Sequence, residues 1–202
     1  SCTYPGNGDY SLNFNGENQF VTTENLNIDG WTIGTIETLL KFNSNDWGND
    51  GTWIFNKSEN STDYFGLVIN SFTSDNNLSI SFGHYSGEWI IVSSEEQPIL
   101  GEWYHIVATW NLNDVKIYIN GEERASFSSE TPIIVPNNGT LYIGNSDDNE
   151  GMFGNISSLN IWDRELNENE LNNGYETYSG LKAYYKFNAG SGDILYDHSG
   201  NG

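Results

Sequence analysis

The fold of this chain is decided by the stretch from Leu141 to Leu171, LYIGNSDDNEGMFGNISSLNIWDRELNENEL. It predicts a short strand over 141–144, an acidic turn over 145–150 and a second strand, with alternating apolar residues, over 153–162. The turn carries several carboxylates and has no cation nearby. Either water or a metal ion must therefore accommodate its charge.

The end of the same stretch predicts one short helix near 167–174. Asn167 can cap this helix, and Glu170 can reach back to close a capping box. Leu166 and Leu171 stand where a hydrophobic staple joins the two sides of a helix start. A glycine at the far end supplies the stop.

Alternation with a period of two recurs along the rest of the chain, and its breaks carry Gly, Asn, Asp and Pro, as is typical of an antiparallel sandwich. The pair Asn120-Gly121 predicts a two-residue hairpin turn, because both residues adopt positive φ at little cost. We find no linker or repeat, so one all-β domain over 1–202 is expected. Strands are expected at 10–15, 19–23, 32–42, 52–57, 64–70, 78–84, 89–93, 103–110, 115–120, 122–127, 141–144, 153–162 and 181–187.

The formal net charge is −21, from 7 Lys plus Arg against 28 Asp plus Glu. Such a charge repels nucleic acid phosphates and anionic lipid heads, so we expect neither as a partner. Membrane insertion is not expected either, because no apolar run approaches the roughly 18 residues that cross a bilayer. The single Cys forms no internal disulfide, so cysteine pairing gives no support for an extracellular location. For most carboxylates the plain alternative is a solvated acidic surface.

Polar loops contribute four aromatic side chains that could contact a ligand. Trp47 lies among Asn and Asp residues, where no apolar period buries it. Tyr64 ends the polar loop 58–64, and Tyr85 and Trp89 flank a short turn. Each ring has a structural alternative, because Trp47 can fold over the sandwich edge and the others can pack in the core or at its rim.

Several motifs, taken in order, resemble laminin-G-like and pentraxin-like domains of the concanavalin A-type lectin and glucanase superfamily. Residues 11–21, SLNFNGENQFV, are similar to the opening strand and turn of such domains, and 101–108, GEWYHIVA, to a central strand. Residues 115–121, VKIYING, and 153–171 match two further motifs. The resemblance implies an antiparallel jelly-roll β-sandwich.

The last segment, 181–202, resembles a motif that often precedes the opening strand of these domains. Its place at the end implies tandem copies in a parent protein. The chain also begins without an initiator Met, a basic start or an apolar signal core. We therefore expect 1–202 to be a domain excised from a longer, multidomain protein.

In pentraxin-like domains calcium is held by the acidic run after the 141–144 strand, together with a carboxylate and an amide at the start of an earlier strand. Ser146 stands where a carboxylate is usual and Tyr64 where an amide is usual, so one ion rather than two is expected. Ca²⁺ takes six to eight oxygen ligands, some of them from the backbone and water. The side-chain ligands implied by the resemblance are Asp63, Asp147, Asp148, Asn149 and Glu150.

The resemblance therefore implies a calcium-binding, lectin-like recognition domain of a secreted or cell-surface adhesin, which binds a glycan or a protein ligand outside the cell. Trp47, Tyr64, Tyr85 and Trp89 are the expected ligand platform. The alternative is a structural spacer or protein-interaction repeat of a large adhesin, in which calcium only stiffens the fold. No catalytic residue is expected, because E-x-D-x-x-E, G-x-S-x-G and HExxH patterns are absent. His105 is expected to be packed and hydrogen-bonded rather than a zinc ligand.

Overall fold

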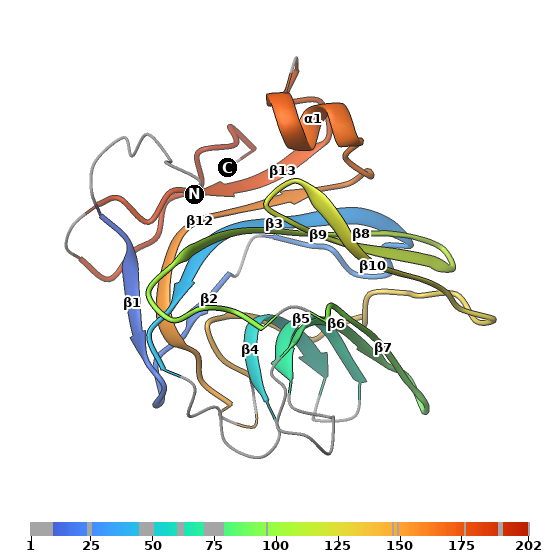
Figure 1. Ribbon diagram of the computed structural model, residues 1–202, viewed down its shortest axis with the longest axis horizontal. Coiled ribbons are helices and arrows are strands. Elements are labelled where there is room, and N and C mark those ends of the chain that lie inside the picture. The colour runs from blue at the N-terminus through green and yellow to red at the C-terminus, as the bar shows by residue number, and fades with distance from the viewer. Residues whose placement is uncertain are drawn as a thin grey trace.

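Two antiparallel sheets pack face to face in a computed structural model of the chain (Figure 1). Of residues 59 and 70 only the backbone is described. The structure describes residues 10–23, 26–44, 51–59, 63–70, 79–95, 97–146, 148, 150–175, 177–189 and 192–201.

Each expected strand is present, and the ends differ from the expected ends by a few residues at most. The all-β sandwich with one short helix is thus confirmed, and the strand order is consistent with a jelly roll. Sheet A has the order β1 (Leu12–Asn15), β12 (Phe153–Trp162), β3 (Ile33–Phe42), β8 (Trp103–Asn111), β9 (Asp114–Ile119) and β10 (Glu122–Ser128), with β13 (Leu181–Tyr185) also paired to β12. Sheet B has the order β2 (Val21–Thr22), β11 (Thr140–Ile143), β4 (Thr52–Glu59), β5 (Asp63–Asn70), β6 (Ser79–Tyr85) and β7 (Trp89–Ser93).

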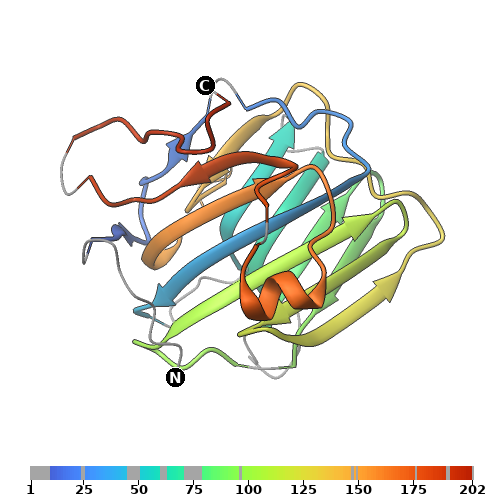
Figure 2. The same ribbon diagram turned by 90° about the horizontal axis from the view of Figure 1, so that it is seen from above.

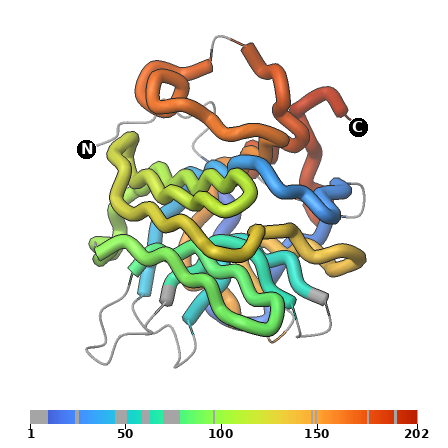
Figure 3. Tube along the Cα trace, turned by 90° about the vertical axis from the view of Figure 1, so that its right-hand side faces the viewer, coloured from blue at the N-terminus to red at the C-terminus, as the bar shows by residue number. Residues whose placement is uncertain are grey.

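The hairpin between β9 and β10 turns at the predicted pair. Asn120 has φ 53° and Gly121 has φ 84°, the two positive values that this kind of turn requires. The register then pairs Glu122 with Ile119. At this side of the sandwich β10 of sheet A lies next to β7 of sheet B (Figure 3).

The predicted helix is also confirmed, as α1 (Glu168–Asn173). The Asn167 side chain accepts a hydrogen bond from the Glu170 backbone nitrogen at 3.1 Å, and the Glu170 carboxylate accepts one from the Asn167 nitrogen at 3.0 Å. Leu171 packs with Val107 of β8 and Tyr118 of β9, so α1 covers the outer face of sheet A (Figure 2). No helix in the described ranges is long and apolar enough to cross a membrane.

Aromatic rings join the two sheets in the core. Trp110 of β8 meets Phe65 of β5 with ring centroids 4.9 Å apart, and Phe65 meets Phe82 of β6 at 5.1 Å. All three side chains are fully buried. Each such burial contributes about 1.5–3 kcal/mol, so these rings fix the distance and register of one sheet against the other.

A buried carboxylate holds sheet A to the segment after α1. Glu37 of β3 accepts hydrogen bonds from His105 at 2.8 Å, from Asn160 at 2.9 Å and from the Tyr175 hydroxyl. Burial raises the pKa of Glu37, but the hydrogen bond and charge of His105 and the bonds from Tyr175 and Asn160 outweigh burial and lower the pKa overall. The expectation of a packed, hydrogen-bonded His105 is confirmed.

The last strand belongs to the same sandwich. β13 pairs with β12, and Ala183 and Tyr185 lie in the main core. Asp197 bridges back to Tyr185, and its carboxylate accepts the Tyr184 backbone nitrogen at 2.8 Å. The segment from β13 to this turn is therefore part of the described fold, and the tandem arrangement stays a prediction.

Gly144 directly follows β11 and begins the acidic turn. Its φ is 80°, and a Cβ there would lie 2.2 Å from the Phe14 ring in the core. Gly144→Ala should therefore lower the free energy of unfolding by about 1–3 kcal/mol, as overpacking does in other cores. Urea unfolding against wild type measures the loss. Gly87→Ala is the control for positive φ alone, because no atom lies within 4 Å of its Cβ position. Equal losses in the two variants would contradict a destabilising clash between the new Cβ and the Phe14 ring.

Candidate functional site

Sheet B presents its second face outward, away from the core. On β5, Phe65 and Leu67 point into the core, so Tyr64 and Val68 point outward, as alternation along a strand requires. Trp53 of β4 pairs directly with Val68 and therefore shares the outer face. The register shift between Trp53 and Phe55 places Ile54 and Phe55 both in the core, so Trp53 points outward although Phe55, two residues on, points inward.

Two tryptophan rings lie over β6 at Gly83. A Cβ on Gly83 would stand 3.4 Å from the Trp53 ring and 3.6 Å from the Trp89 ring. Those distances are ordinary van der Waals contacts, so both rings rest on the backbone of β6 at Gly83. A larger side chain at Gly83 would fill the space between them.

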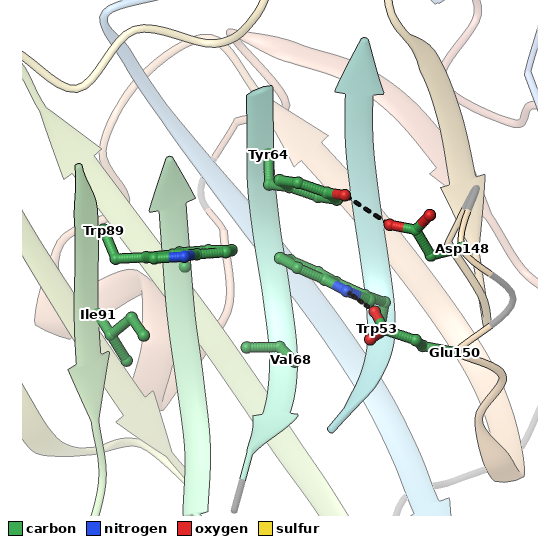
Figure 4. Close-up of a pocket in the computed structure, with 8 residues that line it drawn as sticks. Trp53, Tyr64, Val68, Trp89, Ile91, Asp148 and Glu150 are labelled. Carbon is green, nitrogen blue, oxygen red and sulfur yellow. Dashed lines mark hydrogen bonds between the residues drawn. The ribbon is translucent and has the colours of Figure 1, made fainter. Parts of the chain in front are cut away.

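The rings of this face are nearly parallel, as Figure 4 shows. Tyr64 stacks on Trp53 with centroids 6.0 Å apart and planes 13° apart, and on Trp89 at 5.6 Å and 23°. Trp53 is 4% exposed, whereas Trp89 is 47% exposed. Tyr85 packs against Trp89 at 5.1 Å. The result is an aromatic platform with a buried end at Trp53 and an open end at Trp89.

Two carboxylates from the acidic turn stand at the buried end. The Tyr64 hydroxyl donates to Asp148 at 2.5 Å, and the Trp53 indole nitrogen donates to Glu150 at 2.8 Å (Figure 4). The backbone nitrogen of Trp53 also donates to the Glu150 carbonyl at 3.2 Å. Ser146 exchanges longer contacts with Glu150, at 3.3 and 3.4 Å. Trp53 and Tyr64 thus both form the aromatic platform and bind the acidic turn through hydrogen bonds.

Together these groups enclose a pocket with a volume of about 200 Å³. Pockets for drug-sized ligands measure about 300–1,000 Å³, so this one suits a single small unit of a ligand. Its walls are mostly apolar, and its two carboxylates are hydrogen-bond acceptors. The lining residues are Trp53, Tyr64, Val68, Gly83, Trp89, Ile91, Asp148 and Glu150.

The structure brings together some of the ligand-contacting residues expected from the sequence. Tyr64 and Trp89 line the pocket, and Tyr85 does not line it but packs against Trp89. Trp47 lies outside the described residues. Trp53 was missed, because the sequence places it in a strand and does not tell which face of that strand it occupies.

The predicted metal ligands are only partly described. Asp148 and Glu150 line the pocket. Asp63 precedes Tyr64 in β5 and does not line it; its negative charge partly offsets the lowering of the His84 pKa by burial. Asp147 and Asn149 are outside the described residues. Among the residues that are described, no group of three or more His, Cys, Asp or Glu could hold a metal ion. These carboxylates alone do not supply the oxygens that Ca²⁺ takes, so the calcium site stays a prediction.

The fold defines a β-sandwich of two antiparallel sheets. The sequence profile of the concanavalin A-like lectin/glucanases superfamily matches residues 6–172, and the chain belongs to that family. Human pentraxin-related protein PTX3 is 31% identical over 98 residues, which are 42% of this chain and 26% of PTX3. Rat C-reactive protein is 27% identical over 118 residues, 54% of this chain and 49% of that protein. The chain thus spans half or less of the length of these pentraxins.

Solved structures share the fold at low identity. Domain 4 of the extracellular arabinanase AbnA from Geobacillus stearothermophilus, in complex with arabinotriose, superposes with a TM-score of 0.68 at 17% identity, over 80% of this chain and 74% of that one. The carbohydrate-binding module of a Ruminococcus gnavus sialidase, bound to α2,3-sialyllactose, gives 0.65 at 13% identity, over 80% and 94%. These likenesses concern the fold.

Proposed function

We propose that this chain is a carbohydrate-binding domain of a secreted or cell-surface protein, and that the pocket on the outer face of sheet B holds a sugar residue. The observation that carries the proposal is the near-parallel arrangement of Trp53, Tyr64 and Trp89 beside the carboxylates Asp148 and Glu150. The proposed extracellular location rests on the resemblance of the sequence to pentraxins.

The chemistry of a sugar matches both parts of the pocket. A pyranose or furanose ring has apolar C–H faces, which pack on the flat Trp89 and Tyr64 rings. Its hydroxyl groups are hydrogen-bond donors, and the carboxylates of the pocket are acceptors. Arabinotriose and sialyllactose are ligands of two proteins with this fold, which supports the class of ligand and not its identity.

We favour binding over catalysis. The superfamily includes glucanases, so the fold does not decide between the two. The sequence lacks the E-x-D-x-x-E pattern by which one strand supplies the carboxylates of a retaining hydrolase. Asp148 and Glu150 instead lie in a turn, where each accepts a hydrogen bond from an aromatic side chain of the platform.

Calcium belongs to the proposal as an accessory ion. Asp148 and Glu150 of the acidic turn lie next to the aromatic platform, so an ion bound there would stand beside the sugar and contact its hydroxyl groups. The support is the pentraxin-like order of motifs, together with the position of Asp148 at the pocket. Extracellular modules bind calcium with Kd of about 10⁻⁴–10⁻³ M, so millimolar calcium is the condition to test.

A glycan array probed with the purified domain, with millimolar calcium and again with a chelator, tests the proposal. We expect a defined set of glycans to bind, and the chelator to weaken that binding. Binding that the chelator leaves unchanged would keep the carbohydrate function and remove calcium from it. An array without any hit, together with calcium-dependent thermal stability, would contradict the proposal and support the spacer role.

A further inference from the structure

The pocket on sheet B is closed on the side of the acidic turn. Beyond Trp53, the next outward positions of β4 are Asn56 and Ser58, which pair with Gly66 and Tyr64 of β5. The exposed fractions of Asn56 and Ser58 are 0% and 3%, so neither position offers a surface to a ligand. A chain of sugars that enters the pocket therefore does not continue across β4 toward β11.

The acidic turn forms the wall at this closed side, because it is bonded directly to β4. The Trp53 backbone nitrogen donates to the Glu150 carbonyl at 3.2 Å, and the Thr52 hydroxyl donates to the Gly151 carbonyl at 3.4 Å. These bonds hold the end of the turn against the sheet. The side chains of Asp148 and Glu150 therefore face the pocket from a fixed backbone (Figure 4).

The opposite side of the pocket is open. Trp89 and Ile91 lie across the pocket from the two carboxylates (Figure 4), and Trp89 is 47% exposed. Their strand, β7, is the last in the order of sheet B, so within the described part of the chain no further strand of this sheet lies beyond it (Figure 1). A glycan therefore reaches the pocket past β7 and ends against the acidic turn.

The closed side also selects by chemistry. The carboxylates of Asp148 and Glu150 accept hydrogen bonds and donate none. A free hydroxyl group of a sugar donates to them, whereas the oxygen of a glycosidic linkage carries no hydrogen. A linkage placed against this wall would leave acceptors facing acceptors, and polar groups that lose water without gaining a partner cost free energy. The wall thus suits a sugar residue that carries no further sugar on that side.

We propose that the pocket recognises the terminal, non-reducing residue of a glycan, with free hydroxyl groups directed at Asp148 and Glu150 and the rest of the chain leaving past Trp89. The proposal rests on the function proposed above and deepens it. Glycans attached to proteins or lipids are linked through their reducing ends, so the end that is free to enter is the non-reducing one. The pocket volume of about 200 Å³ agrees with a single sugar residue.

The test compares the ends and the lengths of ligands. Arabino-, gluco-, galacto- and manno-oligosaccharides of one to six residues are titrated calorimetrically into the wild-type domain. In each series that binds, the trisaccharide is compared with two derivatives. One carries a methyl ether on the non-reducing residue, at the hydroxyl group to which the next sugar would be linked. The other has its reducing end converted to the alditol.

Two variants accompany these titrations. Trp89→Ala removes the ring at the open side of the pocket. Phe20→Ala is the matched control, since Phe20 is a 52% exposed aromatic residue that contacts Tyr142 of β11, on the far side of β4. Thermal unfolding of each variant checks that it is folded.

We expect the affinity to change by less than about threefold between two and six residues, because only the terminal residue fills the pocket. The methyl ether should weaken binding about tenfold or more, the usual effect of losing a hydrogen bond to a charged group. The alditol should bind like its parent. Trp89→Ala should weaken binding at every length, and Phe20→Ala at none.

Three results would overturn terminal recognition: affinity that keeps rising with length, a methyl ether that binds as well as its parent, or an alditol that binds more weakly than the methyl ether. A loss in Phe20→Ala that grows with length would also overturn it. If Trp89→Ala still weakens binding in those cases, the carbohydrate function stands without the terminal preference. If no oligosaccharide binds the wild-type domain, the carbohydrate function fails as well.

Discussion

Replacement of Glu37 by Ala is expected to lower the free energy of unfolding by about 3–5 kcal/mol, the usual cost of removing one partner from a buried charged pair. Glu37 is 4% exposed, and its carboxylate is the shared acceptor for His105, Asn160 and Tyr175. Without it, partly buried donors from β8, β12 and the segment after α1 lose this shared acceptor. Urea unfolding at neutral pH measures the loss.

An exposed pair gives the matched control. Glu122 and Arg124 approach to 2.8 Å, but their side chains are 73% and 40% exposed. Exposed pairs contribute about 0–1 kcal/mol, so Glu122→Ala should leave stability nearly unchanged. If Glu37→Ala cost no more than Glu122→Ala, the buried network would not hold the segment after α1 to sheet A.

The same carboxylate predicts a dependence of stability on pH. The pKa of folded Glu37 lies below its usual value of 4.5, so as the pH falls the unfolded chain binds a proton at this site before the folded one does. The contribution of Glu37 is therefore complete above about pH 4.5 and is lost as the pH falls through the folded pKa. Glu37→Gln should lose less stability than wild type over that acid range. Parallel curves for the two proteins would contradict this linkage.

Much of the fold could be predicted because local signals agree with the global pattern. Asn120-Gly121 permits the positive φ values of its hairpin, and Asn167 with Glu170 closes a capping box that the structure contains. Alternation over β12 separates buried Ile156 and Leu159 from more exposed neighbours. Each of these signals is local, so a single sequence is enough to show it.

The site was harder to predict because it depends on strand pairing across the sheet. Trp53 reaches the outer face through an irregular register between β4 and β5, which no local pattern reveals. Gly83 matters only because two rings from other strands rest on it. The sequence therefore locates the acidic turn, Tyr64 and Trp89, but not Trp53 between them.

Replacement of Trp89 by Ala is expected to weaken binding of the best oligosaccharide about thirtyfold, as the loss of a central aromatic anchor typically costs about 2 kcal/mol or more. Trp89 is 47% exposed, so stability should change little. Trp89→Phe should restore part of the affinity, because a flat ring remains beside Tyr64. Calorimetric titration measures the affinities, and thermal unfolding checks the fold.

Mutation of Trp89 tests binding with less effect on stability than mutation of Trp53. Trp53 is 4% exposed and bonded to Glu150, so its loss would cost about 3–5 kcal/mol of stability and confuse the two effects. Trp103→Ala is the matched control, since Trp103 is a partly exposed tryptophan of sheet A that contacts Lys41. If Trp103→Ala weakened binding as much as Trp89→Ala, the outer face of sheet B would not be the site. Loss confined to Trp89→Ala locates sugar recognition at the open end of the platform, where a chain of sugars could enter toward Asp148.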